Sequence, residues 1–284
     1  MSLTLTAILL GILEGLTEFL PVSSSGHLVL VPALLGWDQP PLNFDIVLHF
    51  GTLAAVVVYY RHELATICRH IAGYSKEKAT PEEKSRPLGK TNGRYLAILL
   101  ILATIPAVVI GFPLKDWVEE TLLNPLTAGI GLLITGAALY AADRVAARRD
   151  GSEACAMTGR DALLVGLAQA IAIMPGISRS GSTITAGLWR GLNRDWSAKF
   201  AFLMSVPPIA GAFVLAAHDL AAEADLVTQL PCYVLGFVVS AVVGYAAIYA
   251  VIRSVGEGCL FVRFGIYCIS LGVVSITARL LGLI

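Results

Sequence analysis

The strongest constraint on this chain is a series of apolar stretches, each about the length that crosses a lipid bilayer. A transmembrane helix needs about 20 mostly apolar residues, and six stretches meet that requirement with soft edges: 44–60, 95–112, 126–142, 200–217, 231–252 and 264–282. Only 14% of the residues are charged, whereas a soluble domain has about 25%. We therefore predict an all-α polytopic membrane protein, and the composition excludes a soluble enzyme, a disordered chain and a nucleic-acid binder with a basic face.

Two further apolar regions are interrupted near the middle by clusters of Pro, Gly and Ser. The regions are 3–36 and 162–190, and the interruptions are PVSSSG at 21–26 and PGISRSG at 175–181. Each region predicts two short half-helices joined by an irregular loop. Irregular backbone at membrane depth is tolerated only where protein or a water-filled cavity satisfies it. We therefore interpret both regions as re-entrant helical hairpins.

The positive charges are distributed unevenly along the chain. Seventeen of the twenty Lys and Arg residues lie in four segments: 61–94, 143–161, 190–199 and 253–263. The segments 113–125 and 218–230 together hold one, Lys115. Because cytoplasmic loops carry the excess of Lys and Arg, we expect the four basic segments in the cytoplasm and both chain termini outside. The polar segment 61–94 is interpreted as a solvated cytoplasmic connector.

An offset of 155 residues aligns the two interrupted regions. Under that offset Gly11, Glu14, Val22, Ser23, Ser25 and Gly26 fall on Gly166, Gln169, Ile177, Ser178, Ser180 and Gly181. The charge distribution places the two hairpins in opposite orientations. The chain is therefore predicted to be one integral membrane domain over 1–284, with inverted repeats at approximately 1–142 and 162–284. Such repeats with broken helices place a site near the membrane midplane, between the two loops.

The first hairpin contains two acidic residues, Glu14 and Glu18, one helical turn apart. Ionisable groups inside a membrane cost about 2.5–3.5 kcal/mol each on insertion scales and are candidates for function. Two carboxylates at this spacing repel unless one is protonated or a cation lies between them. A hard divalent cation with oxygen ligands suits the pair. An interfacial helix with its acids in water fits poorly, because 3–20 is otherwise almost wholly apolar.

Three consecutive serines, Ser23, Ser24 and Ser25, follow these acids, and Gly26 and His27 come next. A hydroxyl close to an imidazole or a carboxylate is the minimal arrangement for nucleophilic catalysis. The spacing lets the Ser24 hydroxyl and the His27 imidazole converge, with Glu18 available to take the proton or orient the ring. Serine and glycine also suit a loop that needs local hydrogen bonds, so the pattern alone leaves both interpretations open.

The second hairpin contributes the motif PGISRSGST (175–183), which offers one permanent cation, Arg179, among hydroxyl groups. The flanking residues are Ser178, Ser180, Ser182 and Thr183. A guanidinium, hydroxyls and a helix N-terminus together form an anion site, for which phosphate is the natural ligand. Arg179 also suits a structural role as counter-ion for Glu14 or Glu18, and the two roles are compatible.

Asp45 and His49, four residues apart at the head of the first long span, are candidates for the outer vestibule of such a site. His49 is equally well explained as a buried histidine with its own hydrogen-bond partners.

The two loops together predict phosphoryl chemistry at a membrane-embedded site. One loop brings carboxylates, hydroxyls and an imidazole, and the other brings a phosphate cradle centred on Arg179. Only a lipid-borne phosphate meets such a site naturally. The alternative is a transporter that holds a lipid headgroup during flipping, since inverted repeats and broken helices are typical of transporters. Transport needs charge matching but no nucleophile, so phosphate release in detergent would distinguish the two.

Two long motifs, EGLTEFLPVSSSGHL (14–28) and PGISRSGST (175–183), resemble the signatures of the bacterial undecaprenyl-diphosphatases, the bacitracin-resistance family. FDIVLHFGTLAAVVVYYR (44–61) resembles the family's next segment, and the resemblance spans essentially the whole chain. It implies hydrolysis of undecaprenyl diphosphate to the monophosphate, which recycles the lipid carrier of cell-wall synthesis and confers bacitracin resistance. It also implies a re-entrant, inverted-repeat fold in the bacterial inner membrane and a site that faces the periplasm.

The resemblance also implies roles for individual residues. By motif position, Glu14 and Glu18 are the acidic, metal-binding pair, Ser24 the nucleophile, His27 the essential imidazole and Arg179 the diphosphate clamp. Substrate contacts around them are expected from Ser23, Ser25, Ser178, Ser180 and Thr183. The family's activity depends on Mg²⁺ or Ca²⁺. The sequence leaves open whether a phospho-serine forms or water attacks directly, and whether the chain forms a homodimer.

Overall fold

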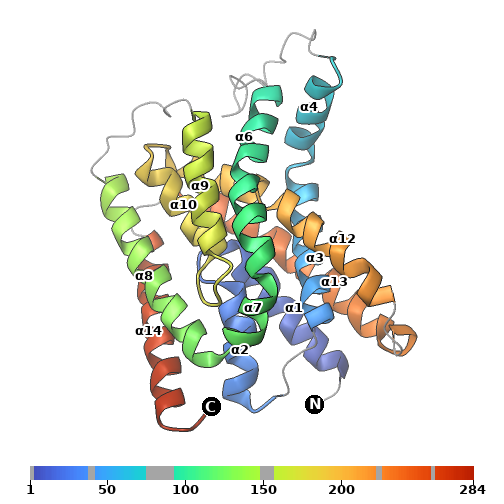
Figure 1. Ribbon diagram of the computed structural model, residues 1–284, viewed down its shortest axis with the longest axis vertical. Helices are drawn as coiled ribbons and strands as arrows, with labels where there is room; N and C mark the ends of the chain where they lie inside the picture. Colours follow the sequence, from blue (N-terminus) through green and yellow to red (C-terminus); the bar gives the residue numbers. More distant parts are fainter. Residues whose placement is uncertain (1–2, 38–41, 75–92, 148–156, 222–225, 257–259) are drawn as a thin grey trace.

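The computed structural model describes residues 3–37, 42–74, 93–147, 157–221, 226–256 and 260–284. Within these ranges all regular structure is helical (Figure 1). In chain order the helices are α1 (Leu3–Phe19), α2 (Ser24–Leu35), α3 (Leu42–Tyr59), α4 (Arg61–Ile71), α6 (Gly93–Pro106), the π-helix η1 (Ala107–Gly111), α7 (Phe112–Thr121), α8 (Pro125–Ala147), α9 (Gly159–Ile171), α10 (Arg179–Trp189), α11 (Arg194–Leu203), α12 (Val206–Ala221), α13 (Leu226–Ser254) and α14 (Leu260–Leu280).

The helices that can cross a membrane match the six predicted spans. Five are long and apolar enough on their own: Gly93–Thr121, Pro125–Ala146, Arg194–Ala217, Thr228–Ser254 and Leu260–Leu280. The sixth is a bent pair, Asn43–Tyr59 and Arg61–Ile71, with an angle of 75° between its parts. Large apolar side chains cover the outside of the spans, where Ile101, Val214 and Val242 are 62%, 72% and 65% exposed. The prediction of an all-α polytopic membrane protein is confirmed.

The predicted connector over 61–94 needs one correction, because its first part is the helix α4. Ile67 of α4 is buried in the same apolar cluster as Leu96 of α6. A helix with one apolar stripe and many charges has a low mean hydropathy, which is why the sequence indicated a connector. Residues 75–92 of that segment lie outside the described part of the chain.

Both interrupted regions form helical hairpins, α1 with α2 and α9 with α10, and each second half-helix begins with a capping serine. The Ser23 hydroxyl accepts a hydrogen bond from the Gly26 N–H at 3.2 Å. The Ser178 hydroxyl accepts one from the Gly181 N–H at 3.0 Å. A side-chain cap of this kind satisfies a backbone donor that has no partner within the helix. The caps fix where α2 and α10 begin.

The first arms of the two hairpins pack against neighbouring helices in corresponding ways. α1 lies against α13 and α9 lies against α6. A Cβ atom at Gly11 would lie 3.0 Å from the carbonyl oxygen of Gly236, and one at Gly166 would lie 2.3 Å from that of Ala103. α8 and α14 also run side by side, and α1 begins at the end of the molecule where α14 ends (Figure 1). Glycine at the aligned positions 11 and 166 therefore allows α1 to approach α13 closely and α9 to approach α6 closely.

The tips of the two hairpins touch in the interior. A Cβ atom at Gly26 would lie 3.0 Å from the Cα atom of Gly176, and the Ser180 hydroxyl donates to the Leu20 carbonyl at 3.2 Å. Thr135 of α8 anchors the second tip by donating to the Gly176 carbonyl at 2.9 Å. Packing thus brings two segments about 155 residues apart in sequence into one place.

Candidate active site

The hairpin tips border a cavity of about 790 Å³. Its polar and charged lining includes Glu18, Ser23, Ser24, Ser25, Asp45, His49, Gln169, Ser178 and Arg179. The remaining lining is mostly apolar, and η1, α7 and α12 supply much of it, including Val108, Phe112, Pro208 and Leu215; Lys115 and Glu119 of α7 are also part of it. A cavity with a few converging polar groups and a long apolar wall suits an amphiphilic ligand.

Glu18 lies at the centre of the polar lining and joins both hairpins. The Ser24 hydroxyl donates to Glu18 Oε2 at 2.5 Å, and Nη2 of Arg179 forms an ion pair with Glu18 Oε1. The Glu18 side chain is buried, and the three residues come from α1, α2 and α10. The structure thus brings together three residues that the sequence predicted to share a site. A carboxylate in hydrogen-bond contact with a hydroxyl can accept its proton.

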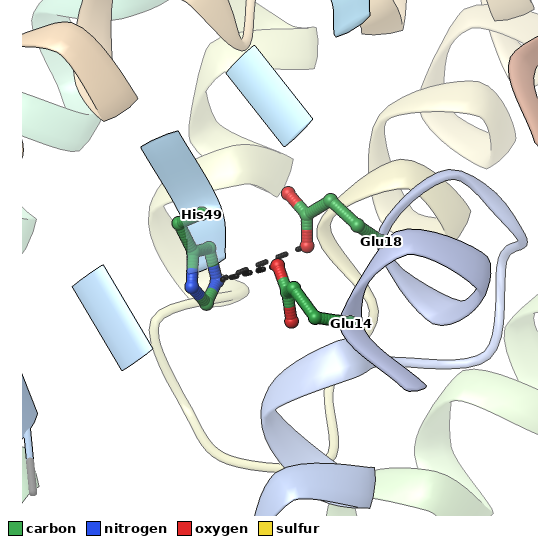
Figure 2. A group of neighbouring side chains, drawn as sticks. All are labelled: Glu14, Glu18 and His49. Atoms are coloured by element: carbon green, nitrogen blue, oxygen red, sulfur yellow. Dashed lines mark ion pairs between the residues drawn. The ribbon is translucent and has the colours of Figure 1, made fainter. Parts of the chain in front are cut away.

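Glu14 lies one turn from Glu18 and is completely buried. Neither of its carboxylate oxygens has a hydrogen-bond partner among the described residues. Figure 2 shows both glutamates pointing toward His49 of α3, whose Nε2 atom is 3.4 Å from Glu14 Oε1 and 3.9 Å from Glu18 Oε2. One ligand atom from each of the three residues lies within 4.8 Å of the others.

This acidic group fits a divalent cation. Buried carboxylates are costly unless they are paired, protonated or bound to a metal. Glu14 has no hydrogen-bond partner in the described structure, and its ion-pair contact is the His49 imidazole. Carboxylate oxygens suit Mg²⁺ or Ca²⁺, whereas imidazole is more typical of transition metals. The sequence pattern by itself does not assign His49 to this group. Its spacing from Asp45 was the only signal, and that spacing does not reveal that α3 packs beside α1.

The N-termini of α2 and α10 both lie at the cavity. The capping residues Ser23 and Ser178 line it, and Ser24 and Arg179 are the first residues of the two helices. The first N–H groups of a helix have no partner within the helix, and its N-terminus carries a partial positive charge. Arg179 adds a full charge, and its Nη1 atom is buried without a hydrogen-bond partner in the described structure. Two helix ends and one guanidinium form a site for a phosphate group.

The other predicted substrate-binding residues divide into two groups. Ser25 lines the cavity, and its hydroxyl is 3.3 Å from that of Ser23. Ser180 and Thr183 are buried outside the cavity lining. The Thr183 hydroxyl donates to the Arg179 carbonyl at 2.8 Å. Ser180 and Thr183 therefore support the backbone around Arg179 and do not face a ligand in the cavity.

His27 is the predicted site residue whose position differs most from expectation. Its Nδ1 atom lies 2.7 Å from the Ser23 carbonyl oxygen, and its Nε2 atom lies 2.7 Å from the hydroxyl oxygen of Tyr267 on α14. The expected convergence of the His27 ring with the Ser24 hydroxyl is therefore wrong, and Glu18 is the partner of that hydroxyl. His27 lies in the first turn of α2, where its ring folds back onto the carbonyl four residues earlier. No sequence pattern indicates Tyr267 as a partner of His27.

Comparison with known proteins identifies relatives along the whole chain. The model of a family described as bacitracin resistance protein BacA matches residues 7–274. An undecaprenyl-diphosphatase of Syntrophotalea carbinolica is 40% identical over 270 residues, which cover 94% of this chain and 96% of that protein. The undecaprenyl-diphosphatase of Alteromonas mediterranea is also 40% identical over 270 residues, covering 94% and 95%. That of Methanosphaera stadtmanae is 37% identical over 273 residues, covering 96% of each chain.

Proposed function

This chain belongs to the BacA family of bacitracin resistance proteins, and we propose that it hydrolyses undecaprenyl diphosphate to undecaprenyl phosphate and inorganic phosphate. The observation that carries this proposal is the contact of Ser24, Glu18 and Arg179 at the polar end of a cavity with a long apolar wall. The undecaprenyl-diphosphatases described above support the same substrate. The product is the lipid carrier that cell-wall synthesis uses again.

The geometry suggests how the substrate lies. We place its terminal phosphate between the N-termini of α2 and α10, within reach of the unpartnered Nη1 atom of Arg179. The polyprenyl chain follows the apolar wall of η1, α7 and α12. This arrangement keeps the charged group among helix ends and a guanidinium while the hydrocarbon remains in apolar surroundings.

In the proposed reaction the Ser24 hydroxyl oxygen attacks the terminal phosphorus atom. Glu18 Oε2 takes the hydroxyl proton, with which it already forms a hydrogen bond. The bond from that phosphorus to the bridging oxygen breaks, and undecaprenyl phosphate leaves. Arg179 stabilises the negative charge on the transferring group. Glu18 passes the proton to the departing undecaprenyl phosphate and is a carboxylate again. Water then attacks the phosphorus atom of the phospho-serine, and Glu18 accepts a proton from that water. Glu18 returns this proton to Ser24 Oγ as the P–Oγ bond breaks and inorganic phosphate is released.

We further propose that Glu14 and Glu18, with His49 beside them, hold a divalent cation, Mg²⁺ or Ca²⁺. The support is the buried Glu14 carboxylate without a hydrogen-bond partner in the described structure and the short distances within the group. When bound, such an ion supplies positive charge that neutralises phosphate oxygens. The chain itself holds the two carboxylates one helical turn apart and leaves the Glu14 oxygens without a hydrogen-bond donor in the described structure.

The protein is a multi-pass membrane protein. We propose that it lies in the bacterial cytoplasmic membrane, with both termini and the polar end of the cavity on the periplasmic side. The uneven distribution of Lys and Arg supports this orientation, and α1 begins at the end of the molecule where α14 ends (Figure 1).

The proposed reaction is tested by phosphate release from undecaprenyl diphosphate, with purified protein in detergent and Mg²⁺ or Ca²⁺ present. We expect release by the wild type and by the control Ser254→Ala, at the last residue of α13 and outside the cavity lining. Ser24→Ala should bind the substrate but release phosphate at least about 10³-fold more slowly, because loss of a nucleophile costs several orders of magnitude. Substrate labelled in its terminal phosphate should label wild-type protein in quenched reactions.

Each part of the proposal has its own contrary outcome. Absence of release by the wild type would contradict the hydrolase and favour a lipid transporter that uses the same phosphate-binding loops. Release by folded Ser24→Ala at close to the wild-type rate would keep the hydrolase and make water, activated by Glu18, the nucleophile.

A further inference from the structure

We propose that Tyr267 is a positioning residue for this reaction. Through the neutral imidazole of His27 it holds the carbonyl group of Ser23, and thereby the backbone that carries the Ser24 hydroxyl. The inference rests on the proposed function, in which Ser24 is the nucleophile. Tyr267 lies on α14, 240 residues from His27 in the sequence, and neither residue lines the cavity.

The hydrogen bonds around His27 define a direction. A carbonyl oxygen only accepts hydrogen bonds, so the contact of 2.7 Å with the Ser23 carbonyl places the hydrogen on Nδ1. The His27 side chain is buried, and no carboxylate in the described structure forms an ion pair with it. Burial without a counter-ion favours the neutral ring. Nε2 is then an acceptor, and the Tyr267 hydroxyl donates to it at 2.7 Å.

The carbonyl that His27 holds belongs to an unusual residue. Ser23 has φ of 70° and is the only residue other than glycine with positive φ in the described ranges. Residues in such conformations persist only where their surroundings hold them. Two groups of His27 contact the Ser23 carbonyl, the backbone N–H at 3.2 Å and Nδ1 at 2.7 Å. Because Ser23 directly precedes Ser24, its conformation sets the direction in which the Ser24 hydroxyl meets Glu18.

α14 fixes this tip from the side that does not line the cavity. The Tyr267 and His27 rings are stacked, with centroids 5.7 Å apart and planes 10° from parallel. The next residue, Cys268, is fully buried, and its sulfur lies 3.8 Å from the Pro21 carbonyl oxygen. Two consecutive residues of α14 therefore contact the first hairpin on both sides of Ser23. The Tyr267 hydroxyl adds a directional bond to packing that a phenyl ring would also provide.

The kinetic test compares Tyr267→Phe with Tyr245→Phe. Tyr245 is a partly exposed tyrosine on α13 whose ring packs against Tyr59, with centroids 5.5 Å apart. We expect kcat to fall roughly tenfold in Tyr267→Phe with KM within about twofold, because the bound substrate keeps Arg179 while the nucleophile loses its alignment. Tyr245→Phe should retain the wild-type rate. Equal kcat in Tyr267→Phe and the wild type would overturn the inference.

A second comparison separates positioning by His27 from proton transfer. The amide nitrogen of asparagine can occupy the place of Nδ1 and donate to the Ser23 carbonyl, whereas that of glutamine lies one carbon further along the side chain. We expect His27→Asn to retain at least about tenfold more kcat than His27→Gln. Two equally inactive proteins, both folded by gel filtration and thermal melt, would indicate that the imidazole transfers a proton and would overturn the inference.

A measurement without turnover tests the hydrogen-bond direction itself. In ¹⁵N-histidine NMR of the wild type, the signals lost in His27→Asn should be those of a neutral ring protonated at Nδ1. A ring protonated at Nε2, or an imidazolium at neutral pH, would overturn the inference. Wild-type protein that releases no phosphate would refute the proposed function and, with it, this role of Tyr267. Release by the wild type with unchanged turnover in Tyr267→Phe would refute only the inference.

Discussion

The first hairpin, α1 with α2, and the second, α9 with α10, share a serine cap at the start of the second half-helix, although Ser23 has φ of 70° and Ser178 has φ of −69°. In each, a serine caps the second half-helix by accepting a hydrogen bond from the glycine N–H three residues later, at 3.2 Å for Ser23 and 3.0 Å for Ser178. In each, the hydroxyl two residues after the cap lies close to the capping hydroxyl, at 3.3 Å and 3.2 Å. The same capping contacts therefore begin two helices whose N-termini lie at one cavity.

The side chains on these two backbones differ in charge and chemistry. The offset of 155 residues pairs Glu14 with Gln169 and Ser24 with Arg179. The first hairpin thus carries the acids and the candidate nucleophile, and the second carries the cation. The comparison shows that two similarly capped helices can each present a positive N-terminus to the cavity while their side chains supply different chemistry. The division also places an acid and its counter-ion on separate elements, so that the site forms only when both hairpins pack together.

The acids Glu14 and Glu18 offer the largest test of this division, because the aligned positions of the second hairpin carry no acid. A chelator should abolish phosphate release, and Mg²⁺ or Ca²⁺ should restore it, if Glu14 and Glu18 hold the cation. Glu14→Gln should reduce the rate less than Glu18→Gln, because the aligned position of the second repeat already carries Gln169 and because Glu18 contacts Ser24. Rates measured across a series of metal concentrations check both expectations.

One outcome would separate the cation from these acids. If the double variant Glu14→Gln/Glu18→Gln were folded, still partly active and as sensitive to the chelator as the wild type, the cation would have to bind elsewhere.

The cation of the second hairpin offers the next test. Arg179→Lys keeps the charge but loses the planar guanidinium, which here contacts Glu18 with one nitrogen and leaves another unpartnered in the described structure. We expect a loss of tenfold or more in kcat/KM, since about 1.4 kcal/mol of transition-state binding corresponds to tenfold. Near-normal turnover in steady-state assays would restrict Arg179 to its role as counter-ion of Glu18.

A smaller effect tests whether the first arms of the two hairpins pack alike. A Cβ atom at Gly166 would lie 2.3 Å from a backbone oxygen of α6, and one at Gly11 would lie 3.0 Å from a backbone oxygen of α13. Gly166→Ala should lower the free energy of unfolding by about 1–3 kcal/mol through overpacking, and Gly11→Ala should lower it less. Thermal or denaturant unfolding in one detergent measures the order, and a more stable Gly166→Ala protein would contradict this packing.

The predicted orientation of the hairpins is tested by cysteine labelling, for which no change in activity is expected. A single cysteine at position 80 should react with an impermeant reagent only after the membrane is broken, because 61–94 holds eight Lys and Arg residues. A cysteine at position 222 should react from outside intact cells. Both positions lie beyond the described residues, so this test depends on the charge distribution alone. Reversed labelling would overturn the orientation.

The sequence by itself determined the class of fold and the position of both hairpins. Apolar stretches of about 20 residues and clusters of Pro, Gly and Ser are local signals, and each predicted span overlaps a helix of the structure. It also identified Glu18, Ser24 and Arg179, because ionisable and hydroxyl groups are conspicuous in an apolar background. The sequence does not predict the polar helix α4, because its apolar stripe is buried only through packing against α6.

Only the tertiary structure decided which of these groups meet. In the structure the Ser24 hydroxyl forms a hydrogen bond with Glu18, and the His27 ring contacts Ser23 and Tyr267. His49 lies beside the acids. These contacts depend on how α1, α3 and α14 pack against one another, over sequence separations of up to 240 residues. A local pattern records which side chains a helix carries, whereas the partner of each side chain depends on the neighbouring helix that packing places beside it.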